Sequence, residues 1–94
     1  MRIRWTRRAL DNLDAAVEHI AADNPEAAKR VARTIWDLVR LLAGQPRMGR
    51  PGRVPGTREL VISGLPFIVP YVVGDGEVAI LRVMHTSMKW PESF

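Results

Sequence analysis

The sequence is poor in the residues that build covalent or metal-held sites. It contains no cysteine, and its two histidines, His19 and His85, lie far apart in the chain. A disulfide framework and a thiolate metal site are therefore excluded, and the histidine spacing matches no zinc motif. We accordingly expect no metal site and no cofactor. The absence of cysteine also agrees with a reducing compartment.

Long apolar runs are absent as well. The longest apolar stretch is much shorter than the about 20 residues that a membrane-spanning helix needs. The charged start, Met-Arg-Ile-Arg-Trp-Thr-Arg-Arg, is not followed by an apolar run of secretory length, so we predict no signal peptide and no membrane partner. We expect a cytoplasmic protein with one domain over residues 1–94, whose length allows only a modest core.

Positive charge is abundant and is carried almost entirely by arginine. The net charge is +4, and twelve of the fourteen cationic side chains are arginine. The planar, permanently charged guanidinium matches phosphate and carboxylate geometry better than the lysine ammonium does. The excess therefore favours an anionic partner, although a GC-rich genome would produce the same bias.

The most basic segment runs from residue 47 to 58. It contains four arginines, three glycines and two prolines, and no acidic residue occurs between Asp37 and Glu59. Glycine and proline at this density predict a loop and not a helix or strand. Two interpretations remain open. The loop presents its arginines to an anionic macromolecule, or it is a solvated loop that keeps a small protein soluble.

Two amphipathic helices are predicted before this loop. Thr6 is a suitable N-cap for the first, and its apolar residues recur at the spacing of one helical face: Leu10, Leu13, Val17 and Ile20. The polar residues Asp11, Asn12, Asp14 and Glu18 fall mostly on the opposite side. The second helix has its apolar face at Ala28, Val31, Ile35, Leu38 and Leu42, and Gly44 ends it.

The segment Asp23-Asn24-Pro25-Glu26 separates the two helices. If Asp23 is the N-cap of the second helix, Glu26 occupies the capping-box position. If Asn24 is the N-cap, Pro25 takes the favoured first helical position. A link this short predicts that the helices pack as an antiparallel hairpin.

Strand-like runs flank the helices and the loop. Residues 2–5 alternate like a short strand, and runs at 60–63, 67–73 and 78–84 follow the loop, the last ending at His85. Gly74-Asp75-Gly76 predicts a hairpin turn between the last two runs. Pro70 cannot donate to a ladder and predicts a bulge or a local edge. The order β-α-α-β-β-β predicts an α+β fold, with the helical hairpin packed on a small, mostly antiparallel sheet.

His85 and Arg58 are the residues best suited to catalysis. Alternation places His85 on one face of the last strand, at its end, where a histidine can transfer protons near neutral pH. With Arg58 beside it, it could activate an RNA 2′-hydroxyl and stabilise the phosphorane that follows. A histidine at a strand end also commonly has only a structural role. We interpret Glu59 as the ion-pair partner of a loop arginine and not as a general base.

Several segments together resemble the RelE/ParE superfamily of bacterial toxins. They are Ile-Arg-Trp-Thr followed by a helix, Ile-Ala-Ala-Asp-Asn-Pro-Glu-Ala-Ala, the basic segment through Gly-Thr-Arg-Glu-Leu, and Ile-Leu-Arg-Val-Met-His-Thr-Ser-Met-Lys-Trp-Pro. The resemblance covers nearly the whole chain. It implies the toxin half of a type II toxin–antitoxin pair, with a cognate antitoxin protein as partner, and a fold that agrees with the order given above.

The resemblance implies two alternative targets. RelE-like members cleave mRNA on the ribosome, and Arg58 and His85 match positions that some of these mRNA interferases use. ParE-like members poison DNA gyrase and are not nucleases. This sequence departs from the RelE-like pattern in two ways. The loop before the first of the last three strands lacks lysine, and the only tyrosine, Tyr71, is not near His85 in the sequence. The long helical hairpin and short tail also resemble ParE or the related StbE group, so we expect gyrase as the target.

Ribosome-dependent RNA cleavage and a non-toxic binding module remain the alternatives, so the sequence leaves open whether the chain is an enzyme. The expected contacts with the target or with nucleic acid are Arg47, Arg50, Arg53, Arg58, Arg82 and Lys89. Two amphipathic helices and one sheet face carry more apolar surface than a small core hides. We therefore also expect an apolar groove for an antitoxin segment.

Overall fold

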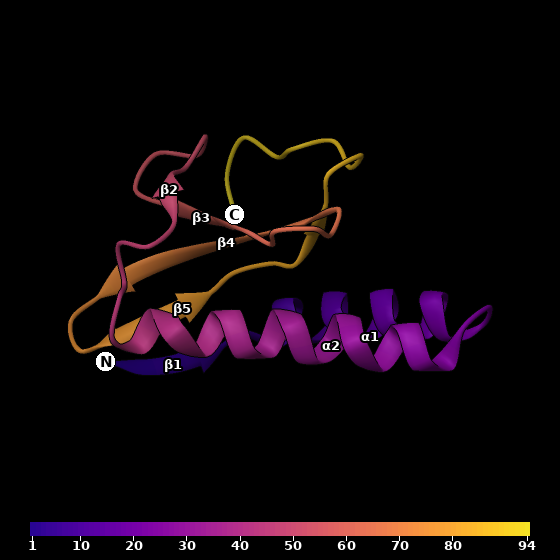
Figure 1. The fold of residues 1–94 in the computed structure, drawn as a ribbon. Helices are drawn as coiled ribbons and strands as arrows, with labels where there is room; N and C mark the ends of the chain where they lie inside the picture. The colour runs from indigo at the N-terminus through magenta and orange to yellow at the C-terminus, as the bar shows by residue number, and fades with distance from the viewer.

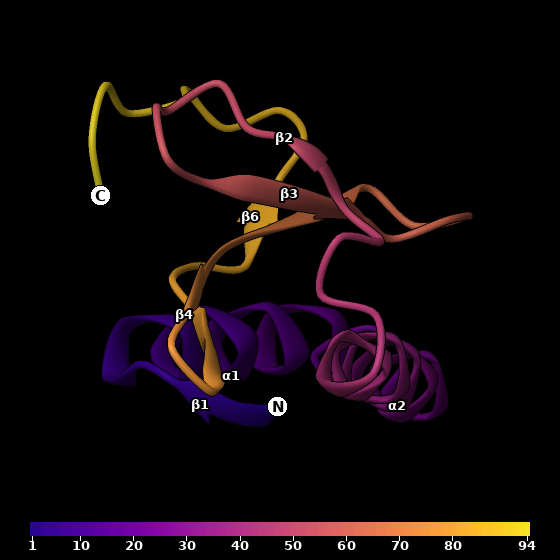
Figure 2. The same ribbon diagram turned by 90° about the vertical axis from the view of Figure 1, so that its left-hand side faces the viewer.

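The computed structural model describes residues 1–94 and has two layers, with two helices lying against one face of a sheet (Figure 1). Helix α1 spans Arg7–Ala21 and helix α2 spans Pro25–Arg40, followed by a short 3₁₀ helix, η1, at Leu41–Ala43. Figure 2 shows both helices on the same side of the strands, with the segment after η1 climbing to the opposite side. No helix combines the length and the apolar character needed to cross a bilayer.

The helix caps follow from local sequence. The Thr6 hydroxyl accepts a hydrogen bond from the Ala9 N–H at the start of α1, which confirms the predicted cap. Asn24 caps α2, because its Oδ1 accepts from the Ala27 N–H at 3.1 Å and Pro25 occupies the first turn. Of the two alternatives for this cap, the one with Asn24 is therefore confirmed.

The sheet has the order β1-β5-β4-β3-β2, with β6 also paired to β4. Its strands are β1 Arg2–Trp5, β2 Arg50–Pro51, β3 Arg58–Val61, β4 Phe67–Gly74, β5 Glu77–Ile80 and β6 Met84–His85. Only β1 and β5 pair in parallel. The α+β prediction is confirmed. The prediction of an uninterrupted loop over 47–58 was wrong at β2, which pairs with β3.

Pro70 explains why the last predicted strand is broken. The expected run over 78–85 divides into β5 and β6, which pair with opposite ends of β4. Between them the Leu81 N–H donates to the Pro70 carbonyl at 2.9 Å. A residue in an antiparallel strand directs its N–H and C=O to the same side, so the donor that Pro70 lacks would have faced this gap. The predicted local edge at Pro70 is therefore confirmed.

The core lies between the helices and the sheet. It is formed by buried side chains of α1, α2, η1 and strands β3 to β5, among them Leu13, Ile35, Leu42, Val69 and Tyr71. Trp5 stacks on Trp36 with ring centroids 4.9 Å apart, and 42% of Trp36 is exposed. These two tryptophans close one edge of the core.

Candidate binding sites

Tyr71 anchors the arginine-rich loop to the sheet. Its buried hydroxyl donates to the Pro46 carbonyl at 2.7 Å and accepts from the Gly49 N–H at 2.9 Å. Gly49 packs so closely here that a Cβ would lie 2.6 Å from the Tyr71 oxygen and 2.7 Å from the Glu59 carbonyl. The loop therefore begins from a fixed position, and position 49 has no room for a side chain.

Glu59 binds two of the four loop arginines. Only 1% of it is exposed. Its Oε1 accepts from the Arg50 guanidinium at 3.0 and 3.1 Å, and its Oε2 accepts from the Arg53 backbone N–H at 2.8 Å. The Arg53 guanidinium lies 3.4 Å from Oε2 and stacks over the Trp90 ring at 3.9 Å. The expected ion-pair role of Glu59 is confirmed, and Arg50 and Arg53 have partners within the chain.

The same contacts set the titration of Glu59. Burial alone would raise the pKa of its carboxyl group, but the hydrogen bonds from the Arg53 backbone and the Arg50 side chain, with the charges of both guanidinium groups, outweigh burial. The net result is a pKa below the ordinary value of 4.5. Glu59 is therefore an ionised structural carboxylate at neutral pH.

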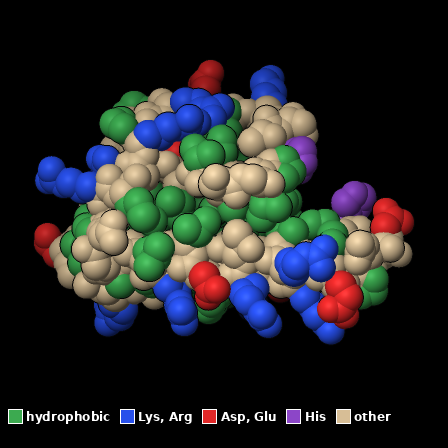
Figure 3. Space-filling view, viewed as in Figure 1, with side chains coloured by type: hydrophobic (Ala, Val, Ile, Leu, Met, Phe, Trp, Pro, Cys, Tyr) green, Lys and Arg blue, Asp and Glu red, His purple; other side chains and the backbone are tan.

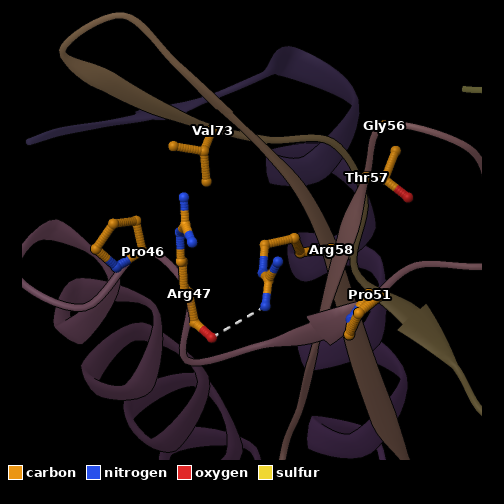
Figure 4. A pocket seen from close by; sticks show the side chains of 7 residues that line it. All are labelled: Pro46, Arg47, Pro51, Gly56, Thr57, Arg58 and Val73. Carbon is orange, nitrogen blue, oxygen red and sulfur yellow. Dashed lines mark hydrogen bonds between the residues drawn. The ribbon is translucent and has the colours of Figure 1, made fainter.

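Arg47 and Arg58 line a hollow of about 520 Å³ between the start of the loop, β3 and the end of β4 (Figure 4). Arg58 donates from Nε to the Gly49 carbonyl at 3.0 Å and from Nη2 to the Arg47 carbonyl at 3.2 Å. The Arg47 side chain has no hydrogen-bond or ion-pair partner. The other lining residues are neutral: Pro46, Pro51, Gly56, Thr57 and Val73. The hollow thus carries two positive charges and no acidic side chain.

An apolar groove of about 400 Å³ lies between the helices and the opposite end of the sheet. Figure 3 shows a notch on the right-hand side, with hydrophobic side chains inside it and a histidine on each side. Its lining is mostly apolar and includes Ala15, Ala16, Ile20, Val31, Phe67 and Met88, together with Asn12, His19 and His85. The expected apolar groove is therefore present.

A hydrogen bond from Ser87 sets the tautomer of the neutral His85 ring. Its Nδ1 accepts from the Ser87 backbone N–H at 3.1 Å and lies 2.7 Å from the Ser87 hydroxyl. A backbone N–H can only donate, so Nδ1 carries no proton, and the neutral ring has its proton on Nε2. The ring edge also packs against Phe67, with centroids 5.4 Å apart. In this tautomer Nε2 cannot accept a proton from a substrate.

The structure does not bring Arg58 and His85 together. Arg58 lies opposite Tyr71 and His85 lies opposite Phe67, and these partners are four residues apart on β4. At about 3.3 Å per residue this separation is about 13 Å along the strand. Strands β3 and β6 also pair with opposite sides of β4. The two residues therefore belong to different sites, Arg58 to the hollow and His85 to the groove.

Arg82 and Lys89 lie apart from the loop arginines. Arg82 donates from Nε to Asn12 Oδ1 at 2.7 Å, and burial together with the nearby charge of Arg8 lowers its pKa. Lys89 is exposed on the C-terminal tail, without a partner. The prediction that Asn12 falls on the solvent side was wrong, because its Oδ1 also accepts from the Val83 N–H. Helical spacing could not reveal this contact, since its partners are about 70 residues away in the chain.

A family model described as the ParE toxin of the type II toxin–antitoxin system parDE matches residues 3–90. The chain belongs to the ParE toxin family. It is 48% identical over 91 residues to Y4kP, a candidate toxin of Sinorhizobium fredii, an alignment that covers 97% of this chain and 94% of the relative. It is 37% identical over 83 residues to Toxin RelE2 of Caulobacter vibrioides, covering 88% and 92% of the two chains.

A solved structure resembles this ParE-family chain in fold and sequence. It is described as the chromosomal ParDE toxin–antitoxin system from P. aeruginosa. The two chains superpose with a TM-score of 0.82 at 35% identity, over 90% of this chain and 95% of the other. The chain is therefore the toxin of a type II toxin–antitoxin module, and the family implies a cognate antitoxin as its partner.

Replacement of Glu59 by glutamine in this ParE-family toxin should destabilise the fold by about 2 kcal/mol at pH 7, because the buried charge-assisted hydrogen bonds are lost. A carboxyl group whose pKa is lowered by folding stabilises the fold above its unfolded pKa, and this contribution disappears as the pH falls through the folded pKa. The difference between wild type and Glu59→Gln should therefore persist at pH 7 and shrink below pH 4.5.

Urea denaturation at pH 7 and pH 3 measures this difference. Glu92→Gln is the matched control, because Glu92 is exposed on the tail and makes no ion pair. A difference between wild type and Glu59→Gln that stays constant over this pH range would contradict the assigned role of the Glu59 charge.

Proposed function

We propose that this toxin arrests bacterial growth by inhibiting DNA gyrase and that it is not a nuclease. The separation of Arg58 from His85 is the observation that carries the proposal. Cleavage of RNA through its 2′-hydroxyl needs a proton-transfer group and a cation at the same phosphate. Here the two residues occupy different sites, and the Arg58 guanidinium is bound to two backbone carbonyls.

The protonation of the remaining candidates supports the same proposal. The neutral His85 ring carries its proton on Nε2, because Nδ1 accepts from Ser87. Tyr71 is fully buried, with its hydroxyl bound to two backbone groups. Glu59 is buried and paired with arginines. No group suited to general base catalysis therefore faces the arginine hollow.

Gyrase inhibition can be tested directly with purified toxin. Gyrase should lose its supercoiling activity on relaxed plasmid in proportion to added toxin, while mRNA in a translating extract stays intact. Addition of the cognate antitoxin before the toxin should restore supercoiling and serves as the control. Full supercoiling at toxin concentrations that arrest growth in cells would refute the proposed target.

RNA cleavage is the second candidate, because a relative 37% identical to this chain is named Toxin RelE2 and because His85 is exposed at the groove. Histidine acting as a general acid or base contributes about 10²–10⁴-fold to a rate. If the chain cleaves RNA, His85→Ala should abolish growth arrest. If our proposal holds, His85→Ala and wild type should arrest growth alike.

His19→Ala is the matched control for that comparison, since His19 lines the same groove from α1. Growth after induction and the integrity of ribosome-bound mRNA are measured for each variant at equal protein level. Cuts in mRNA that require His85 but not His19 would establish the nuclease and overturn the gyrase proposal. Unimpaired growth with wild type at confirmed expression would favour the non-toxic binding module.

We also propose that an apolar segment of the antitoxin occupies the groove. Its mostly apolar lining faces solvent in the isolated chain, and contiguous exposed apolar surface commonly marks an interface. The polar groups at its rim are donors, namely Nε2–H of His85 and the side-chain amide N–H groups of Asn12, whose Oδ1 is already bound. A partner with apolar side chains and carbonyl or carboxylate acceptors fits this arrangement.

A methionine pair tests the position of the antitoxin. Met88 lines the groove and is 45% exposed, whereas Met48 lies outside it and is 38% exposed. Met88→Glu should weaken antitoxin binding about 100-fold, because a charge would be buried in an apolar contact. Met48→Glu adds the same charge outside the groove and should weaken binding at least tenfold less than Met88→Glu does. Calorimetric titration of each variant measures the effect, and equal affinities for the two variants would exclude the groove.

A further inference from the structure

The arginine hollow is an unbalanced charge site. Arg47 and Arg58 are joined by the hydrogen bond from Arg58 Nη2 to the Arg47 carbonyl, and none of the seven lining residues is acidic. The other two loop arginines differ, because both are paired with the buried Glu59. The hollow therefore has two positive charges in its lining and no counter-charge there, and an anion bound in it would be attracted by both.

The hollow is also preorganised. Two backbone carbonyls fix the Arg58 guanidinium through Nε and Nη2, so its Nη1 hydrogens and one Nη2 hydrogen have no partner in the chain. Pro46 and Pro51 form rigid walls, and the Tyr71 hydroxyl holds the loop start at Pro46 and Gly49. An anion entering the hollow would therefore meet a guanidinium that loses little further freedom on binding.

The surrounding surface favours a polyanion over a protein of mixed charge. Between Asp37 and Asp75 the only acidic residue is Glu59, and that carboxylate is buried. The whole stretch from residue 38 to 74 therefore exposes cations and no carboxylate. Arg50 and Arg53 also keep about half of their side-chain surface exposed, although they are ion-paired with Glu59. This extended one-sign surface suits a chain of phosphates.

We propose that the hollow between Arg47 and Arg58 binds a phosphate group of a nucleic-acid backbone. The inference goes beyond the proposed function, because the site would bind such a phosphate independently of gyrase and without any cleavage. The contact reads no sequence, since it is made to the backbone alone. Arg47 supplies an exposed arm of the site that has no partner in the chain, and Arg58 supplies an arm fixed by two backbone carbonyls.

Arg47→Gln tests the site without a risk to the fold, because the Arg47 side chain is exposed and has no partner. A 20-base-pair fluorescent duplex is titrated with purified toxin at several salt concentrations. Loss of one phosphate contact should reduce the slope of log affinity against log salt by about 1, equivalent to about tenfold weaker binding at 0.1 M salt. The effect should be the same for duplexes of unrelated sequence.

Arg30→Gln is the matched control. It removes the same charge from the exposed face of α2, and Arg30 also has no partner in the chain. Its salt slope should stay within about 0.3 of wild type, because no phosphate contact is lost. Equal slopes for Arg47→Gln and Arg30→Gln would overturn the inference, since the effect would then come from net charge alone.

Inorganic phosphate provides a second readout. Millimolar phosphate should shift the amide NMR signals of Gly56 and Thr57, and Arg47→Gln should suppress these shifts while Arg30→Gln retains them. Competition by a polyglutamate peptide but not by duplex DNA would identify an acidic protein as the occupant and overturn the inference. Absence of phosphate shifts at these residues would do the same.

The outcome is separable from the test of gyrase inhibition. DNA binding that depends on Arg47, together with unaffected supercoiling, would refute the proposed target and leave the phosphate site standing. Inhibition of supercoiling by a toxin whose DNA binding is insensitive to Arg47→Gln would refute the phosphate site alone.

Discussion

The arrangement of the basic surface depends on the buried carboxylate of Glu59. One oxygen accepts from the Arg50 side chain, and the other accepts from the Arg53 backbone and lies next to the Arg53 guanidinium. A single carboxylate on β3 therefore holds both β2 and the loop segment at Arg53 that follows it. An acid this deeply buried is tolerated only when it is fully hydrogen-bonded. Those contacts restrain Arg50 and Arg53, and Arg53 in turn holds the C-terminal tail through Trp90. Four arginines that look equivalent in the sequence are thereby divided into two structural ones and two that line a hollow.

The neighbours of Glu59 on β3 and β4 connect the arginine-rich loop to the core. Glu59 alternates with Arg58 and Leu60, so its neighbours on β3 face the helices while Glu59 faces the loop. On β4, Tyr71 belongs to the core, yet its hydroxyl ends at the loop backbone. The loop is thus bound from both faces of the sheet, which explains how a segment rich in glycine and proline keeps one conformation.

Much of the fold could be predicted because its signals are local. Helical periodicity and the Thr6 cap located α1, and the missing donor at Pro70 predicted a bulge or a local edge, of which the edge is present in β4. The contacts that were missed join distant segments. Strand β2 exists only because β3 pairs with it, and Asn12 is drawn inward by residues 82 and 83. No short-range pattern carries such information.

The candidate sites show the same limit. The residues predicted to contact a target are accessible to solvent. Arg58 and Arg82 are half-buried, and the others are exposed. Their grouping could not be foreseen, because it depends on which side of β4 each neighbouring strand occupies. Arg58 on β3 and His85 on β6 look like a possible pair in the sequence, and the order of strands separates them.

This separation has a consequence for neutralisation. The groove and the arginine hollow share no lining residue, and they lie toward opposite ends of β4, with Phe67 at the groove and Val73 at the hollow. An antitoxin segment that fills the groove alone would therefore leave Arg47 and Arg58 accessible. Neutralisation through the groove must either block a target contact made there or be accompanied by a second, acidic part of the antitoxin that reaches the loop. The distribution of charge favours the second arrangement, because the hollow carries two arginines and no acidic side chain, whereas the lining of the groove is mostly apolar.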